Sequence, residues 1–234
     1  IEALGPDQVL GVIGDSSSLP RRELAEAQEL AASFGARIAI VAPQEERDPQ
    51  YLANPPDRCY YCKRALFASI GELARQQGLA HVADGNNADD AGDWRPGRRA
   101  AAELGVRSPL MEVGLTKAEV RELSQRFGLP TASKPAAACL ASRLPYGTTI
   151  TPAILSQVEQ AEQILQDLGF RQIRVRHHGE LARIEVDGAE ISRLAAEPTR
   201  SQVVAKLKVL GYHHVAVDLE GYRMGSLNAA LKSG

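Results

Sequence analysis

Short apolar runs alternate with helix-length amphipathic segments over the first two-thirds of this chain. Residues 8–13 and 37–41 have the length and branched side chains of buried strands, and 80–83 is a third, shorter candidate. Helices are predicted over 20–34 and 58–77, each followed by a glycine. Strands that alternate with helices indicate a parallel sheet covered on both faces, with ligand-binding loops beyond the carboxyl ends of the strands.

The last third of the chain has a different pattern. Residues 131–149 look irregular, and a helix is predicted over 152–168. Two strand-like runs, 171–176 and 181–186, flank a turn, and a further strand is predicted at 214–218. We therefore expect an α/β domain over residues 1–148 and a small α+β domain over 149–234.

Charge and cysteine content narrow the class of protein. The 234 residues carry a formal net charge of −2, which gives no bulk electrostatic sign of a nucleic-acid partner. No apolar run approaches the roughly 20 residues that a membrane-spanning helix needs. Three cysteines are too few, and odd in number, for a secreted disulfide framework. We expect a cytoplasmic protein with neither nucleic acid nor a membrane as its partner.

Two of the cysteines form a C-x-x-C pair at the start of a predicted helix. Cys59 and Cys62 share one helix face, and the helix N-terminus and nearby cationic residues favour their thiolates. Such a pair suits a dithiol redox site, half of a zinc site or two incidental thiols. A zinc site would need a histidine as fourth ligand, His81 or His177. The spacing alone does not bring Cys139 to this pair.

Three further features are each open to two interpretations. The loop 14–18 follows a strand and precedes a helix, as phosphate-binding loops do, but its near lack of glycine favours an ordinary loop with a serine cap. The acidic loop 84–90 suits Mg²⁺ beside a nucleotide or is simply solvated, and Trp94 next to it suits stacking or packing. Arg174 and Arg176 share a strand face that binds phosphate or carboxylate, or only faces solvent.

Several long stretches, in order along the whole chain, together resemble one family. They are residues 15–24, 54–63, 84–90, 139–147 and 220–228. They are similar to the LarE family of ATP-dependent sulfur transferases, which help to make the nickel-pincer nucleotide of lactate racemase. The number and order of these motifs make the resemblance far more specific than any one of them.

The resemblance implies a fold, a reaction and its cofactors. The fold is a Rossmann-like PP-loop domain, of the adenine nucleotide alpha hydrolase type, with a C-terminal domain for substrate binding or oligomerisation. ATP, with Mg²⁺, adenylylates a carboxylate of pyridinium-3,5-biscarboxylic acid mononucleotide, and sulfur then replaces the activated oxygen to give a thiocarboxylate. In one branch the cysteine at position 139 gives up its own sulfur and becomes dehydroalanine. In another, three cysteines hold a [4Fe-4S] cluster whose open iron carries an extra sulfide.

The chain has cysteine at all three positions of the cluster-bearing branch and no other cysteine. The resemblance therefore implies that Cys139 is catalytic and that Cys59, Cys62 and Cys139 are metal ligands. It implies substrate contacts for Ser142, Arg143, Arg174, Arg176 and Glu162, and nucleotide or Mg²⁺ contacts for Asp15, Ser16, Asp84 and Asp90. It also implies a small nucleotide as substrate and a homo-oligomer.

One departure from the family concerns ATP. PP-loop enzymes bind the ATP phosphates with a Ser-Gly-Gly-x-Asp-Ser loop, and no such loop occurs in these residues. The segment 14–18 matches the strand and loop that come next in the family. We therefore expect the first strand, the PP-loop and its helix to lie upstream of Ile1, and we expect residues 1–234 to activate ATP poorly.

Two other functions remain open at this point. A PP-loop tRNA thiolation enzyme can also use three cysteines and a cluster, but it requires a basic RNA-binding surface, which the net charge of −2 does not favour. A zinc-stabilised binding module without catalysis would contain zinc and no iron.

Overall fold

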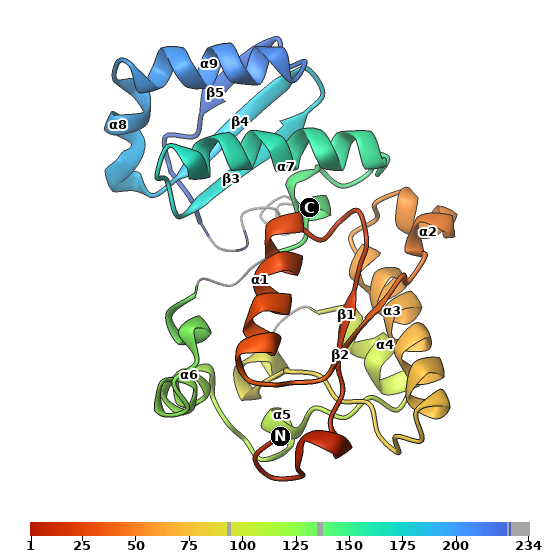
Figure 1. Cartoon of the computed structure of the whole chain (residues 1–234). Coiled ribbons are helices and arrows are strands. Elements are labelled where there is room, and N and C mark those ends of the chain that lie inside the picture. Colours follow the sequence, from red (N-terminus) through yellow and green to blue (C-terminus); the bar gives the residue numbers. More distant parts are fainter. Residues whose placement is uncertain (93–94, 135–137, 224, 226–234) are drawn as a thin grey trace. The chain divides into compact units, whose positions relative to one another are not determined.

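The computed structural model describes residues 1–92, 95–134, 138–223 and 225. The chain forms two compact units, Ile1–Ala137 and Ala138–Gly234, drawn in Figure 1. The units divide before the boundary expected at residue 148, because the short helix η5 (Leu140–Arg143) packs against helix α7 and strand β3 of the second unit. Trp94 lies outside the described residues. So do residue 224 and residues 226–228 of the 220–228 motif.

The first unit combines a parallel strand pair with helices, as the alternating pattern predicts. Strands β1 (Gly11–Gly14) and β2 (Ile38–Val41) pair in parallel, in register from Gly11 opposite Ile38 to Gly14 opposite Val41. The helices are α1 (Arg21–Ser33), α2 (Pro49–Leu52), α3 (Arg58–Gln76), α4 (Gly97–Glu103), α5 (Pro109–Glu112) and α6 (Lys117–Arg126). Four 3-10 turns, η1 (Pro6–Gln8), η2 (Glu45–Arg47), η3 (Ala88–Gly92) and η4 (Pro130–Ser133), join them.

The strand predicted over 80–83 is wrong in its extent. Only an isolated parallel bridge joins Ala83 to Arg107. The Arg107 N–H donates to the Val82 carbonyl at 2.9 Å, and the Asp84 N–H donates to the Arg107 carbonyl at 2.8 Å. The segment thus has a strand-like partner on one side only, and a strand ladder does not develop within the described residues.

Local sequence signals explain where several helices begin and end. Thr116 and Glu119 form a complete capping box at the start of α6. The Thr151 side chain accepts from the Ile154 N–H at the start of α7 (Pro152–Asp167), and Pro152 occupies the first helical position. Gly78 follows α3 with a φ of 66°, a conformation that glycine adopts without strain.

The second unit is a three-stranded sheet covered by helices. Strand β3 (Ile173–His178) pairs antiparallel with β4 (Leu181–Val186), which pairs in parallel with β5 (His214–Val217). Helices α7, α8 (Ile191–Ala195) and α9 (Thr199–Val209) and the turn η6 (Gly188–Glu190) complete it. Its core contains Ala161 and Leu165 from α7 and Val203 and Leu207 from α9.

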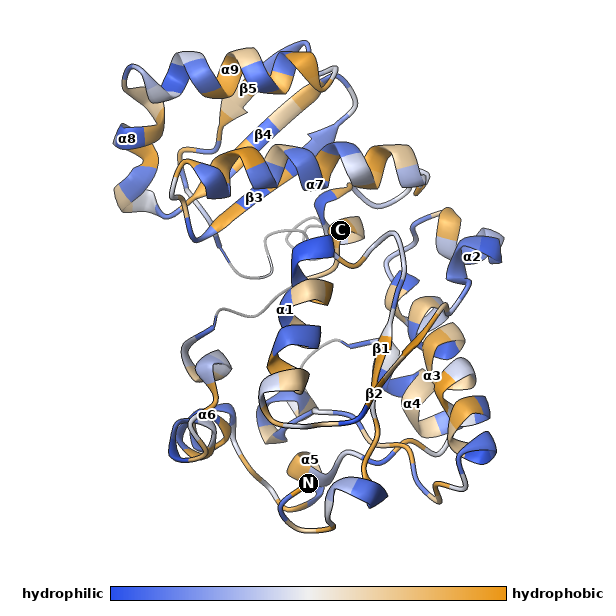
Figure 2. Ribbon diagram, in the orientation of Figure 1, coloured by the Kyte–Doolittle hydropathy of each residue, from blue (hydrophilic) through white to orange (hydrophobic). Residues whose placement is uncertain are grey.

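Alternation along β3 and β4 gives this sheet one apolar and one charged face, visible as alternating colours in Figure 2. Val175 and Ile184 belong to the buried core, whereas Arg176 and Glu185 lie on the opposite face. Helices therefore cover the apolar face, and the charged face is left for polar contacts. In the described part of the chain, no helix is both long and apolar enough to cross a membrane.

Candidate functional site

Cys59 and Cys62 lie in the first turn of α3, in the first unit. Cys59 is exposed and Cys62 is half-buried, and both are thiols in the structure. The start of the helix is fixed by Arg58, which is buried and whose Nη1 donates to Oδ1 of Asn54. Asn54 is itself fully buried and has a φ of 53°, which few residues other than glycine and asparagine tolerate. The cysteine pair thus stands on a rigid helix start.

Cationic and aromatic side chains surround this turn. Arg99 of α4 stacks 3.8 Å from the centroid of the Tyr60 ring, and the Tyr60 hydroxyl donates to Glu103 at 2.7 Å. α4 comes close because its first residue is Gly97. A Cβ at this position would lie 2.8 Å from the Lys63 side chain and 3.3 Å from the Cys59 carbonyl oxygen. The helix N-terminus and these cations together favour bound anions and thiolates.

Cys139 lies in the second unit, where it caps η5. Its carbonyl oxygen accepts from the Ser142 hydroxyl at 2.7 Å, from the Ser142 N–H at 2.9 Å and from Arg143 Nη1 at 2.9 Å. Arg143 Nη1 also donates to the Ala138 carbonyl at 2.7 Å. The backbone on both sides of this half-buried thiol is therefore held by side chains of its own turn.

Arg143 is buried and forms a bidentate ion pair with Glu162 of α7. Its Nε and Nη2 atoms donate to the two carboxylate oxygens at 2.9 and 2.8 Å, and the Val175 N–H of β3 donates to the same carboxylate at 2.9 Å. Burial alone would lower the pKa of Arg143, but the charge and hydrogen bonds of Glu162 outweigh it and raise that pKa. The Arg143–Glu162 pair therefore joins the Cys139 turn to both α7 and β3.

Arg176 forms a second buried ion pair of the same kind. Its Nε and Nη2 atoms donate to Glu185 of β4 at 2.9 and 2.8 Å, and its Nη1 donates to the Ser142 carbonyl at 2.9 Å. Arg183 reaches Glu185 from the other side at 3.2 Å. Glu185 is absent from the residues that the sequence suggests; the available signal was a lone carboxylate between two apolar residues of a predicted strand.

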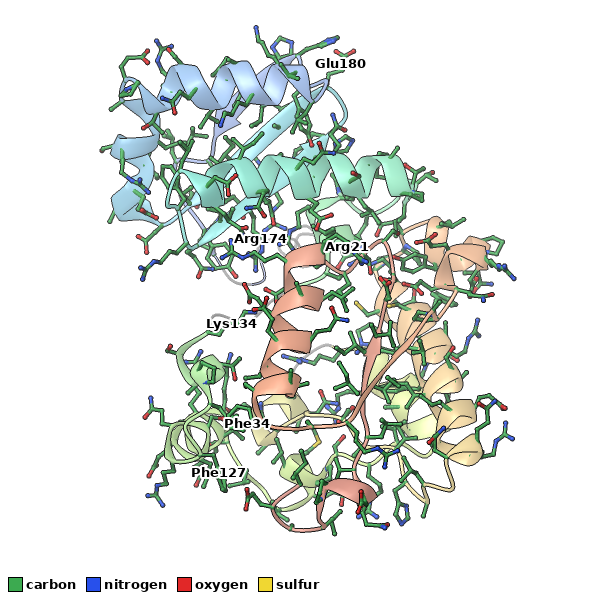
Figure 3. The ribbon with its side chains drawn as sticks, in the orientation of Figure 1. Arg21, Phe34, Phe127, Lys134, Arg174 and Glu180 are labelled. Carbon is green, nitrogen blue, oxygen red and sulfur yellow. The ribbon has the colours of Figure 1, made fainter. Side chains whose placement is uncertain are left out.

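Arg174 differs from these two arginines. It is half-buried, its guanidinium lies 5.0 Å from the Tyr222 ring centroid, and Figure 3 labels its side chain on the β3 edge of the second unit. Burial, and then the charge of Arg143, lower the pKa of Arg174. A bound anion would offset both effects. The structure thus brings together all five residues for which substrate contacts are expected, together with Cys139, within the second unit.

Asp15 and Ser16 line a pocket of about 370 Å³ beyond the carboxyl ends of β1 and β2. The Ser17 N–H donates to Glu46 Oε1 at 3.2 Å across it. Glu45 also lines the pocket and is 1% exposed, and its Oε2 atom has no hydrogen-bond partner among the described residues. A buried carboxylate oxygen in this state is costly and indicates a missing donor.

Asp84 and Asp90 do not line that pocket, and both accept hydrogen bonds from other protein groups. Asp84 accepts from the Ser108 hydroxyl at 2.7 Å, and Asp90 accepts from the Asn87 N–H at 3.0 Å. Within the described ranges, no three His, Cys, Asp or Glu side chains are grouped so that they could hold a metal ion.

The two histidines of the zinc alternative lie in different units. His177 is buried in the second unit, with its Nδ1 3.2 Å from the Tyr212 hydroxyl, and burial, then His178, lowers its pKa. His81 lines a small apolar pocket in the first unit.

Comparison with known proteins identifies relatives over almost the full chain. An uncharacterized protein, slr1717, from a Synechocystis strain is 42% identical, covering 98% of this chain and 85% of its own length. The pyridinium-3,5-bisthiocarboxylic acid mononucleotide synthase of Lactiplantibacillus plantarum is 37% identical, with coverage of 99% and 83%. The uncharacterized protein MJ0830 of Methanocaldococcus jannaschii is 30% identical, with coverage of 74% and 66%. No family model matches the chain.

The identity of 37% over 99% of the chain to the synthase confirms the family resemblance noted in the sequence. This chain belongs to the LarE family, that of the pyridinium-3,5-bisthiocarboxylic acid mononucleotide synthase.

Proposed function

We propose that this protein is an ATP-dependent sulfur transferase that converts a carboxylate of pyridinium-3,5-biscarboxylic acid mononucleotide to a thiocarboxylate. One observation carries the proposal: Cys139 is half-buried in a turn held by Arg143, in a chain 37% identical to a synthase named for the bisthiocarboxylic product. A thiol beside fixed cations suits a reaction between a sulfur nucleophile and an anionic nucleotide.

The reaction needs two steps because a carboxylate is a poor electrophile. In the first, a carboxylate oxygen attacks the α-phosphorus of ATP; the bond to pyrophosphate breaks, and an acyl adenylate forms. In the second, sulfur at the oxidation level of sulfide attacks the acyl carbon. The carbon–oxygen bond breaks, AMP leaves with its electron pair, and the thiol proton is lost to give the thiocarboxylate. No oxidant or reductant is consumed.

Different side chains have different tasks in this proposal. We assign Arg174 to the substrate's phosphate or its second carboxylate, because its half-buried guanidinium lies on β3 in the unit that carries Cys139, and because a bound anion would offset the burial and the Arg143 charge that lower its pKa. Arg143 and Arg176 hold carbonyl groups of the Cys139 turn, and Glu162 holds Arg143. The Ser142 hydroxyl donates to the Cys139 carbonyl, and we propose that it leaves this bond to contact the substrate. The substrate contacts that the family resemblance implies for Arg143, Arg176 and Glu162 stay a prediction beside these supporting roles.

The three thiols fit a [4Fe-4S] cluster as a donor set, because thiolates are the usual ligands of such clusters. Cys59 and Cys62 have the spacing of ligands on one helix face, and Cys139 would be the third ligand. When bound, the cluster would supply an iron without a protein ligand, at which an extra sulfide is held. The residues themselves supply the fixed helix start at Arg58 and the fixed turn at Cys139.

We assign the nucleotide to the first unit, which we propose to be a PP-loop domain. The pocket at Asp15 and Ser16 lies where parallel sheets bind ligands, and a hydroxyl or amine donor from a nucleotide would satisfy Glu45. Asp84 and Asp90 would join Mg²⁺ only after leaving their present loop contacts. We further propose a cytoplasmic homo-oligomer.

The experiment separates the sulfur step from the ATP step. The chain is reconstituted anaerobically with iron and sulfide, its iron and acid-labile sulfide are measured, and the preformed acyl adenylate of the mononucleotide is then added. We expect a thiocarboxylate by mass spectrometry, and we expect Cys139→Ala and Cys59→Ala each to abolish both cluster and product. Stoichiometric zinc without iron, or no thiocarboxylate from a loaded protein, would contradict the proposal.

The sacrificial route is the second candidate, because Arg143 holds the carbonyl groups of Ala138 and Cys139 and so fixes the Cys139 turn without any contribution from the other two thiols. It predicts product in the Cys59→Ala variant, one turnover only, and a mass loss at Cys139 that matches dehydroalanine. A second arm supplies ATP and the free acid and tests the activation step. Release of pyrophosphate and AMP with formation of the thiocarboxylate would support adenylylation, and ATP-independent formation of the thiocarboxylate from the free acid would contradict it.

A further inference from the structure

The turn that carries Cys139 is held at two carbonyl groups by two different arginines. Arg143 holds the Cys139 carbonyl at 2.9 Å, and Arg176 holds the Ser142 carbonyl at 2.9 Å. Each arginine has one Nη atom on the turn and its remaining Nε and Nη atoms on a carboxylate. The turn is thus clamped at both ends, once from α7 through Glu162 and once from the sheet through Glu185.

Glu185 is the more unusual of the two carboxylates. It is fully buried, it lies on β4 diagonally across the antiparallel pair from Arg176, and it is flanked along the strand by buried Ile184 and Val186. Its two oxygens are shared between Arg176 and Arg183. The guanidinium of Arg176 is therefore held flat in one orientation, with its Nη1 directed at the Ser142 carbonyl.

Stability alone does not explain such an arrangement. Removing two charges from water is costly, and well-packed apolar residues of similar volume often stabilise a protein as well or better. A bidentate pair does give what apolar packing lacks, namely a fixed direction for the remaining N–H group. Here the remaining N–H group of Arg176 donates to the Ser142 carbonyl, in the turn that carries the thiol.

We propose that Glu185 is a positioning residue for Cys139, acting through Arg176 and the Ser142 carbonyl. Its contribution to sulfur transfer rests on the proposed function, whereas its effect on the position of the thiol rests only on the contacts above. Loss of the Glu185 charge frees Arg176 to rotate, releases the Ser142 carbonyl and opens the turn, so that Cys139 becomes more accessible.

The test measures the alkylation of each cysteine in the cluster-free, reduced full chain. Wild type and Glu185→Gln are treated with limiting iodoacetamide, and the labelled peptides are quantified by mass spectrometry over time. We expect Cys139 to react about tenfold faster in the variant, which corresponds to about 1.4 kcal/mol lost from the closed turn, a loss typical of one hydrogen bond to a charged group. Cys62, in the other unit, reacts at an unchanged rate and serves as the internal standard.

Three further variants keep the proposal falsifiable. Glu185→Asp retains the charge and should give a smaller increase than Glu185→Gln. Glu180→Gln makes the same chemical change on the exposed hairpin turn between β3 and β4, labelled in Figure 3, and should leave the rate unchanged. Val203→Ala weakens the core of the same unit without touching the turn. The thermal stability of Val203→Ala is compared with that of Glu185→Gln. Val203→Ala should not raise the alkylation rate of Cys139.

Two results would overturn the inference. The first is an unchanged Cys139 rate in Glu185→Gln, and the second is an equal acceleration in Val203→Ala, which would reduce the effect to general loosening of the unit. If Glu185→Gln does not fold, the comparison of Glu185→Asp with Val203→Ala decides. Because alkylation needs neither cluster nor substrate, these outcomes are independent of whether the protein transfers sulfur.

Discussion

Lys134 lies between two carboxylates of α1, 2.7 Å from Glu23 Oε2 and 2.6 Å from Glu26 Oε2, near the end of the first unit (Figure 3). Hydrogen bonds from Lys134, and then from Arg22, lower the pKa of Glu26. Burial would lower the pKa of Lys134, but the hydrogen bonds to both carboxylates outweigh it and raise that pKa. A depressed carboxyl pKa stabilises the fold above the unfolded value and loses that effect as the pH falls through the folded value.

We therefore expect Lys134→Gln to lower the unfolding free energy at pH 7 by about 1 kcal/mol, a small value because the pairs are partly exposed. This loss corresponds to a melting temperature lower by roughly 2–4 °C. The difference from wild type should shrink as the pH falls below about 4.5 and Glu26 is protonated. Thermal melts from pH 7 to acid measure this. Lys208→Gln, at an exposed position of α9, is the control. A difference that stays constant into acid would contradict the assignment.

At the residue scale, the sequence predicts which residues gather but not which partners they take. Ser142, Arg143, Glu162, Arg174 and Arg176 lie in one unit and interact with one another, as their common assignment to the substrate leads one to expect. Their pairing is decided by tertiary geometry: Glu162 reaches Arg143 from another helix, and Glu185 reaches Arg176 across a strand pair. Neither spacing nor periodicity encodes such contacts. A strand face whose charges are exposed therefore has the same sequence pattern as one whose charges form two buried ion pairs.

At the element scale, α3 lies unusually close to the end of β1. A Cβ on Gly14 would lie 2.5 Å from Leu66 Cδ1 and 3.2 Å from Pro43 Cγ. Gly14 does not have a positive φ, so its lack of a side chain serves close packing and not backbone conformation. This contact helps to place the helix that carries Cys59 and Cys62 against the strand pair.

Gly14→Ala should therefore destabilise the protein by about 1–3 kcal/mol through overpacking. Because the nearest obstacle is the end of a flexible side chain, adding Leu66→Ala should make the double variant more stable than the sum of the single changes predicts. Gly71→Ala in the middle of α3 meets nothing within 4 Å and should stabilise by up to about 1 kcal/mol. Urea unfolding measures all four chains, and additive single effects would argue against the contact.

The long helices follow from the sequence because the signals at their ends are local. The helices expected over 20–34, 58–77 and 152–168 are α1 (Arg21–Ser33), α3 (Arg58–Gln76) and α7 (Pro152–Asp167). The strands are less well determined, since their extent depends on partners elsewhere in the chain. β1 begins at Gly11, not at residue 8, because its ladder starts opposite Ile38. Residues 80–83 have strand-forming side chains but a backbone partner only at Arg107.

At the scale of the whole molecule, the second unit contains a complete hydrophobic core. All twelve buried members of that core cluster lie between Ala161 and Tyr212, and the helices that cover the sheet come from the same stretch. The thiol that we propose as catalytic, its two arginines and their carboxylates also belong to this unit. A unit with its own core and its own buried ion pairs meets the usual condition for independent folding.

We expect the fragment 138–234 to unfold in urea in one cooperative transition, with a slope of about 1–3 kcal/mol per molar denaturant. Leu207→Ala removes a fully buried core side chain and should cost about 2–5 kcal/mol. If the unit folds by itself, this cost is the same in the fragment and in the full chain, where it appears in one of two transitions seen by calorimetry. Glu180→Gln, at the exposed turn, should change the unfolding free energy of neither the fragment nor the full chain. A fragment without a cooperative transition, or a Leu207→Ala cost that differs between the two forms, would show that the core of the second unit depends on the first.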